Sequence, residues 1–215
     1  MKRLLPVMLF SLILFLSSCM KDEELWNFEK PEYKTSSKGV FIINEGNFMY
    51  ENASLTYYDI EAQETFDNVF FNTNALPLGD VAQSMQVFDS LGYVVLNGSG
   101  KIYVININDF NYVGKITGLT SPRHIHFINE SKAYVTDLYA RSLAIIDPQL
   151  LQVTGYIDVN NPGSQFNQHP TEQMVQFQKF VFTNSWSFDD KVLVIDTETD
   201  ELVDSIEVLI QPNSL

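Results

Sequence analysis

The sequence repeats one pattern of four short β-rich runs, and this repeat limits the possible folds more than any other feature. The third copy is the clearest, with runs at 121–128, 133–137, 142–147 and 153–159 separated by turn residues and without a helical period. The fourth copy aligns with it, residues 181–184 against 134–137 and 191–196 against 142–147. A polar residue closes the third run of every copy, at 59, 106, 147 and 196.

Four antiparallel strands in a repeat of about 40–50 residues are typical of a β-propeller blade. The apolar, nearly continuous inner runs agree with this, because a blade packs against a neighbour on both of its faces. We therefore predict an all-β fold, a β-propeller of four-stranded antiparallel blades, with about four blades over residues 39–215. A β-sandwich and a solenoid are the alternatives.

Two short motifs connect the chain to a known family. The sequences Tyr134-Val135-Thr136-Asp137 and Val181-Phe182-Thr183-Asn184 resemble the Tyr-Val-Thr-Asn motif of YVTN-repeat, YncE-like propellers. The resemblance extends over residues 39–211, and it implies a ring that closes with seven blades. Gln211-Pro212 aligns with the start of the third and fourth copies, and the first copy has no innermost run before Gly39. We therefore expect an N-terminal fragment of such a ring, in which a fifth repeat begins near 211; the alternative is a closed four-bladed ring.

The first residues read as an export signal. Lys2 and Arg3 precede an apolar run over 4–16, which is too short to span a bilayer comfortably but suits a signal peptide. Leu16-Ser17-Ser18-Cys19 resembles the bacterial lipobox, so we expect a signal peptide over 1–18, lipidation of Cys19 and a tether over 19–38. An ordinary secretory signal is the alternative.

The charged cluster at 21–24 (KDEE) resembles the surface-export signal of lipoproteins in Bacteroidetes. This resemblance implies a protein anchored by lipid in the outer membrane and exposed at the cell surface.

Composition excludes several classes of function. Asp and Glu number 27 against 13 Lys and Arg, a formal net charge of −14. Phosphate capture needs a basic surface, so nucleic acid is not an expected partner, and the lipid anchor is the only expected attachment to a membrane. The sole cysteine rules out an intrachain disulfide and a metal site built from several cysteines.

The longer loops of the repeat connect the second run to the third, and one copy to the next, and in an up-down meander these loops lie on one face. We call this the loop face. It is rich in aromatic and amide side chains and also presents two arginines, and this mixture suits a neutral, partly planar organic ligand or a protein interface. The candidate ligand-binding residues are Asn44, Glu45, Phe48, Tyr50, Arg123, His124, Tyr139, Arg141 and Trp186.

Signals of catalysis are weak. The sequence has no nucleophile elbow and no phosphate-binding glycine loop. A metal or acid–base site would need His124, His169 and Asp137 to converge, whereas we expect these histidines to form hydrogen bonds between blades. We therefore predict a non-catalytic protein without a metal or cofactor.

The combination of lipobox, export cluster, YVTN-type repeats and aromatic loops resembles the surface propeller lipoproteins of gut Bacteroidetes that capture cobalamin. This resemblance implies a binder that passes the vitamin to a TonB-dependent outer-membrane transporter. Three alternatives stay open: a propeller that binds a glycan or peptide, an exported lactonase-type enzyme, and a scaffold or adhesion module.

Overall fold

The computed structural model describes residues 30–36 and 38–215. Residues Glu32–Leu215 form one compact unit, and the description below concerns this unit. The expected signal peptide, Cys19 and the acidic cluster at 21–24 lie outside the described residues. No helix in the described part of the chain is both long and apolar enough to cross a membrane.

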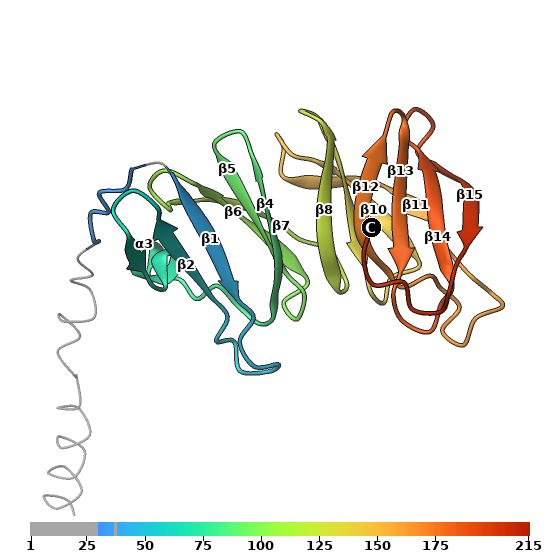
Figure 1. The fold of residues 1–215 in the computed structure, drawn as a ribbon, viewed down its shortest axis with the longest axis horizontal. Coiled ribbons are helices and arrows are strands. Elements are labelled where there is room, and N and C mark those ends of the chain that lie inside the picture. The colour runs from blue at the N-terminus through green and yellow to red at the C-terminus, as the bar shows by residue number, and fades with distance from the viewer. Residues whose placement is uncertain (1–29, 37) are drawn as a thin grey trace, which may run out of the picture. The chain divides into compact units, whose positions relative to one another are not determined.

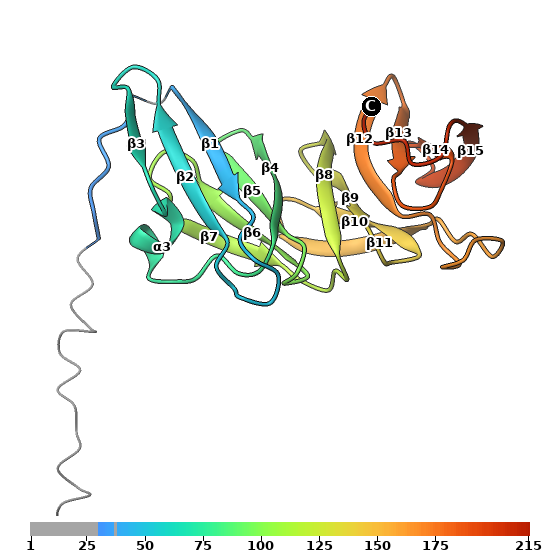
Figure 2. The ribbon, with the colours of Figure 1, turned by 60° about the horizontal axis from the view of Figure 1, so that its bottom comes forward.

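Residues 39–207 form four consecutive antiparallel sheets (Figures 1 and 2), which we number blades 1 to 4. Each blade is a meander in which neighbours in the sheet are also neighbours in the chain. The strands are β1 (Gly39–Asn44), β2 (Ser54–Asp59) and β3 (Glu64–Phe66) in blade 1; β4 (Ala82–Phe88), β5 (Leu91–Leu96), β6 (Lys101–Asn106) and β7 (Tyr112–Ile116) in blade 2; β8 (Pro122–Asn129), β9 (Lys132–Asp137), β10 (Ser142–Asp147) and β11 (Gln152–Asp158) in blade 3; and β12 (Thr171–Phe177), β13 (Phe180–Ser185), β14 (Lys191–Asp196) and β15 (Glu201–Glu207) in blade 4.

This arrangement confirms the prediction of an all-β fold with four antiparallel blades. Blade 1 has three strands, because β1 corresponds to the second strand of the other blades, as the missing run before Gly39 predicted. Residues 211–215 contain no strand. However, the side-chain amide of Asn184 donates a 2.6 Å hydrogen bond to the carbonyl of Pro212, as that of Asn97 does at 3.2 Å to Pro122.

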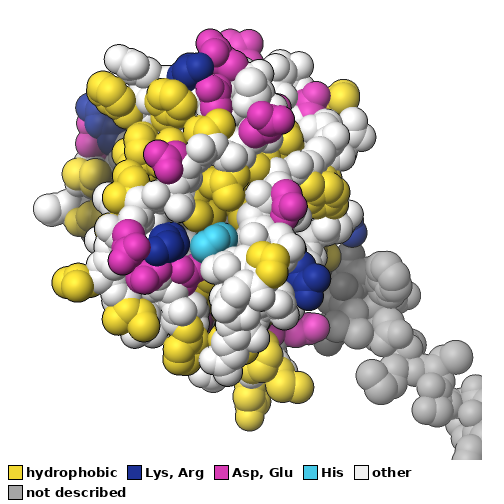
Figure 3. All heavy atoms as spheres, turned by 90° about the vertical axis from the view of Figure 1, so that its right-hand side faces the viewer, with side chains coloured by type: hydrophobic (Ala, Val, Ile, Leu, Met, Phe, Trp, Pro, Cys, Tyr) yellow, Lys and Arg dark blue, Asp and Glu magenta, His cyan; other side chains and the backbone are white. Residues whose placement is uncertain are grey.

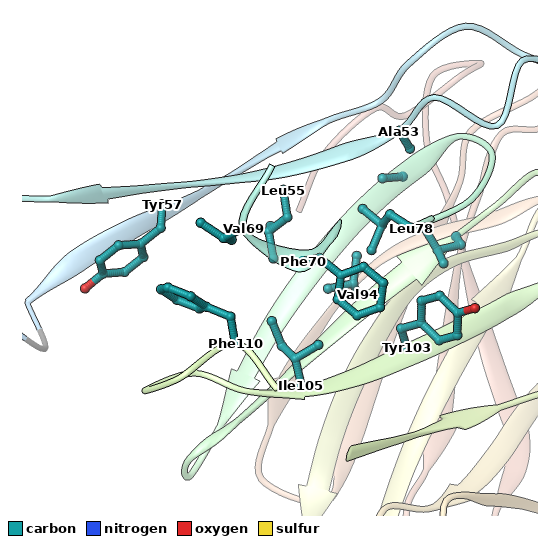
Figure 4. Packing of buried hydrophobic residues seen from close by; sticks show 12 residues of the cluster. Ala53, Leu55, Tyr57, Val69, Phe70, Leu78, Val94, Tyr103, Ile105 and Phe110 are labelled. Carbon is teal, nitrogen blue, oxygen red and sulfur yellow. The ribbon is translucent and has the colours of Figure 1, made fainter. Parts of the chain in front are cut away.

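Three hydrophobic clusters hold the blades together, one at each blade–blade interface. Figure 4 shows the cluster between blades 1 and 2, where Phe110 is fully buried beside Tyr57 and Ile105. The middle strands of a blade, such as β5 and β6, are buried on both faces, which explains their nearly continuous apolar sequences. Burial of each large apolar side chain contributes about 1.5–3 kcal/mol relative to exposure.

The polar residue that closes the third strand of each blade caps the following turn. The Oδ1 atoms of Asp59 and Asp147 each accept two backbone N–H groups from the next three residues, and those of Asn106 and Asp196 accept one. Asp and Asn favour such turns because their short side chains reach the backbone two or three residues on. This residue recurs for a structural reason.

One detail of the sequence interpretation was wrong. Pairing with β14 places Phe182 opposite Val194, just as Tyr134 lies opposite Ile145, so Tyr134 corresponds to Phe182 and not to Val181. The alignment of 181–184 with 134–137 is thus one residue out of register. Between blades 1 and 2 the chain forms the short helix α3 (Val69–Asn74), whose buried Phe70 stacks on Tyr103 with ring centroids 5.2 Å apart.

The four blades do not close on one another. On the free face of blade 1, Val40 and Ile42 are 48% and 43% exposed, and on the free face of blade 4 Phe177 is 65% exposed. Figure 3 looks at the side of the molecule where β14 and β15 lie in Figure 1, and hydrophobic side chains gather there among acidic ones. The closed four-bladed ring considered from the sequence is therefore not the arrangement of this unit.

Candidate ligand-binding face

Loops from all four blades form two adjoining clefts on the loop face. The first, which we call the polar cleft, encloses about 470 Å³ and the second, the aromatic cleft, about 370 Å³. Both volumes fall in the range of about 300–1,000 Å³ that is usual for small-molecule sites. The polar cleft is lined by Glu45, Phe48, Val81, Asn97, Gly98, Thr120, Ser121, Arg123 and Tyr139. The aromatic cleft is lined by Leu138, Tyr139, Phe166, Gln168, Pro170, Trp186, Ser187 and Phe188.

Tyr139 belongs to both clefts and separates them. The buried carboxylate of Asp137 fixes its position, because Oδ1 accepts the backbone N–H groups of Tyr139 and Ala140 at 3.0 and 2.9 Å. The other oxygen, Oδ2, accepts those of Thr120 and Ser121 at 3.1 and 2.8 Å. One side chain at the end of β9 therefore ties together two loops that line the polar cleft.

The aromatic cleft presents ring surfaces to solvent. Tyr139 is 66% exposed and Phe188 is 65% exposed, while Trp186 is less accessible. Phe166 and Phe188 pack at a tilt with their centroids 6.0 Å apart. None of the side chains lining this cleft is charged. Exposed aromatic rings around a concave, uncharged surface bind planar or ring-shaped organic groups by stacking and by excluding water.

Arg123 stands at the boundary between the clefts. Its Nε and Nη2 donate hydrogen bonds of 2.6 and 2.7 Å to the two carboxylate oxygens of Glu172, and its guanidinium lies 6.0 Å from the ring centre of Trp186. Burial alone would raise the pKa of Glu172. Hydrogen bonds and positive charge from His124 and Arg123 outweigh burial, and the pKa of Glu172 lies below its usual value. The pair joins the innermost strands of blades 3 and 4.

The three histidines make separate contacts. His124 Nε2 lies 3.5 Å from Glu172, so it connects blade 3 to blade 4 as predicted from the sequence, and His126 Nε2 lies 3.1 Å from Gln176 of the same neighbouring blade. The expectation of a hydrogen bond between blades is wrong for His169, whose Nδ1 lies 2.5 Å from the buried Asp189 within blade 4. In the described residues, no group of three or more His, Cys, Asp or Glu side chains is arranged to hold a metal ion.

The sequence matches the family described as "Domain of unknown function (DUF5074)" over residues 38–213, a span that contains every strand of the four blades. The chain belongs to the DUF5074 family. No curated protein matches this DUF5074 chain in sequence.

Solved structures similar to the DUF5074 domain show its fold. A quinoprotein alcohol dehydrogenase-like protein from Bacteroides thetaiotaomicron superposes with a TM-score of 0.59 at 16% identity, covering 82% of this chain and 42% of that one. Hydrazine synthase from Kuenenia stuttgartiensis gives 0.56 at 16% identity, over 72% and 43%. The β-propeller domain of Cps50 (Swd1) from Myceliophteria thermophila gives 0.59 at 10% identity, over 74% and 50%.

These comparisons confirm the β-propeller fold. At 10–16% identity they carry no information on function, because one β-propeller fold serves many unrelated functions. The DUF5074 chain spans half or less of the length of these three structures.

Five of the nine residues predicted to bind ligand line the two clefts of the DUF5074 domain. Glu45, Phe48, Arg123 and Tyr139 line the polar cleft, and Trp186 joins Tyr139 in the aromatic cleft. The other four predicted residues lie outside both clefts. They are Asn44, which donates a hydrogen bond to Thr56; His124, which contacts Glu172; and the exposed Tyr50 and Arg141.

Two residues that matter to the clefts were not predicted. Phe166 lies in the longest loop between blades, and the length of that loop was its only signal. Glu172 lies on an inner strand and fixes Arg123 from a position 49 residues away in sequence. Nothing in the spacing of the two residues indicates their pairing.

Proposed function

We propose that this protein is a non-catalytic binding protein that captures a large, partly planar organic nutrient on its loop face, and that the nutrient is cobalamin. The bound ligand would then pass to a TonB-dependent outer-membrane transporter. The observation that carries the proposal is the pair of adjoining clefts with different chemistry, one aromatic and uncharged and one polar, separated by Tyr139.

Cobalamin combines the two kinds of surface that these clefts would meet. Its corrin and benzimidazole rings offer planar surfaces for stacking, and its amide side chains offer donors and acceptors. The clefts lie on loops that β-strands hold in place, and Asp137 fixes two of these loops. A preformed site loses little conformational entropy when a ligand binds, which favours tight capture without chemistry.

Equilibrium binding of cyanocobalamin, followed by the visible absorbance of the vitamin, tests the proposal on protein purified from its native cells. We expect stoichiometric binding that falls at least about tenfold in Trp186→Ala and Tyr139→Ala, because stacked rings dominate such sites. Tyr156→Ala is the matched control, since Tyr156 is 60% exposed on β11 and lines neither the polar nor the aromatic cleft. Absence of binding, with binding of a glycan or peptide instead, would replace cobalamin with that ligand.

The lipid anchor and the transporter are part of the same proposal. Labelling cells with a radioactive fatty acid should mark the wild-type protein and not Cys19→Ser. Protease added to intact cells should degrade a surface-exposed protein. Co-purification of a TonB-dependent transporter after mild cross-linking would support delivery, whereas a free periplasmic protein would contradict both the anchor and the delivery step.

A further inference from the structure

The guanidinium of Arg123 is held in one orientation. Glu172 takes the hydrogens of Nε and Nη2 in a bidentate pair, and the side chains of the two residues are 14% and 9% exposed. The ring of Trp186 lies beside the guanidinium. Glu172 therefore does not engage the third guanidinium nitrogen, Nη1. Arg123 also lines the polar cleft.

We infer that Arg123 anchors an anionic oxygen of the ligand, so that the ligand class is a planar ring system carrying a carboxylate, phosphate or sulfonate group at its edge. The inference rests on the proposed binding function and specifies its chemistry. The ring would lie in the aromatic cleft, against Trp186 and Tyr139, and the acidic group would reach across the boundary to Nη1.

Two physical arguments favour Arg123 for this role. A guanidinium already held by a carboxylate loses little side-chain entropy when it binds another oxygen, and a charge-assisted hydrogen bond is stronger where water is partly excluded. The other charged residue of the polar cleft, Glu45, is exposed, so solvent and salt screen its repulsion of an anion. The second arginine of the loop face, Arg141, is exposed and lines neither cleft.

Two fluorescent probes separate the ring from the acidic group. 8-Anilinonaphthalene-1-sulfonate carries an aromatic ring system and an anionic group, and N-phenyl-1-naphthylamine carries the same rings without the sulfonate. Titration of the purified protein with each probe gives two affinities. The part of each signal that Trp186→Ala abolishes defines binding at the aromatic cleft. Phe177→Ser removes an exposed ring from blade 4 and reports on binding elsewhere.

The variant Arg123→Met alone would leave the charge of Glu172 buried without its arginine partner and could unfold the protein. The double variant Arg123→Met/Glu172→Met removes both charges at once, and Arg141→Met is the matched control. Circular dichroism of each variant establishes that it is folded before it is titrated.

We expect the double variant to bind the sulfonate probe about tenfold more weakly and to bind the neutral probe within about twofold of the wild type. Arg141→Met should change neither affinity. Equal weakening of both probes, or no change in either, would overturn the assignment of Arg123 as an anion anchor. Cyanocobalamin binding is measured separately, so failure of the vitamin to bind and failure of the Arg123 anchor are distinguishable outcomes.

Discussion

Tyr134 and Phe182 occupy the same position in blades 3 and 4, but only Tyr134 has a blade packed over it. Each is the third residue of its blade's second strand and pairs with the strand on either side. Tyr134 is fully buried against blade 4, and its hydroxyl donates a hydrogen bond to Asp200. Burial and the hydrogen bond to Asp200 raise the pKa of Tyr134. Phe182 is partly exposed on the opposite face of blade 4.

The free face of blade 4 therefore has the residue pattern of a blade–blade interface without a neighbour among the described residues. We predict that a chain of these 215 residues alone associates with itself through this face, because an apolar patch of this kind is covered in a stable assembly. Sedimentation velocity over a range of concentrations should show larger species for the wild type and a monomer for Val175→Thr/Phe177→Ser. Tyr156→Ser, which changes an equally exposed ring on β11, should behave like the wild type. A monomeric wild type would refute the prediction.

The same comparison shows how far the sequence predicts the fold. The third residue of the second strand is aromatic in blades 2 to 4, and so is that of β1, the corresponding strand of blade 1; these residues are Phe41, Tyr93, Tyr134 and Phe182. An alignment on these rings gives the observed register. The similarity of Thr183-Asn184 to Thr136-Asp137 favoured a shift of one residue, which places side chains on the wrong face of the sheet. Strand positions were predictable because turns and apolar runs alternate along the chain.

The candidate site was less predictable for a physical reason. Strand order decides which face each loop occupies, so the sequence indicated the face on which the two clefts lie and several of the aromatic residues that line them. The clefts themselves depend on contacts between residues that are distant in sequence, such as Arg123 with Glu172. They also depend on loops of different blades meeting at one place, as those of Tyr139 and Trp186 do at the aromatic cleft. These contacts follow from how one blade packs on the next, which a single sequence does not encode locally.

The pair formed by Arg123 and Glu172 should be costly to break on one side only. We predict that Glu172→Ala destabilises the protein by about 3 kcal/mol, because the guanidinium is left buried without its carboxylate. Arg123→Met/Glu172→Met should recover most of that loss, since neither charge remains. Urea unfolding at pH 7 measures both changes. Lys38→Met is the control, because the Lys38–Glu61 pair is exposed and should contribute less than about 1 kcal/mol. Equal losses in the single and double variants would contradict the prediction.

The exposed rings of the aromatic cleft should contribute to binding and not to stability. Tyr139→Ala and Phe188→Ala remove side chains that are mostly in contact with solvent, so we predict changes in unfolding free energy within about 0.5 kcal/mol. By contrast, Phe110→Ala removes a fully buried ring from the cluster between blades 1 and 2 and should cost about 3–5 kcal/mol. Thermal and urea unfolding compare the three variants directly. A large loss for Tyr139→Ala would mean that this ring supports the loop and is not free for a ligand.

Asp59 should make stability depend on pH in the acid range. Backbone N–H groups, from Ala62 first and then Ser36, lower the pKa of Asp59 to about 2. In the unfolded chain the pKa is about 3.9. The folded state therefore favours the ionised carboxylate, and its contribution is complete above about pH 4 and is lost as the pH falls towards 2. We predict that Asp59→Asn lowers the melting temperature by a few degrees at pH 7 and that the difference from wild type shrinks by pH 2.5.

Asp109→Asn is the control for Asp59→Asn. Asp109 also accepts a backbone hydrogen bond, from Asn111, but its side chain is on an exposed residue. A difference between Asp59→Asn and wild type that stays constant from pH 7 to pH 2.5 would show that the charge of Asp59 does not stabilise the fold.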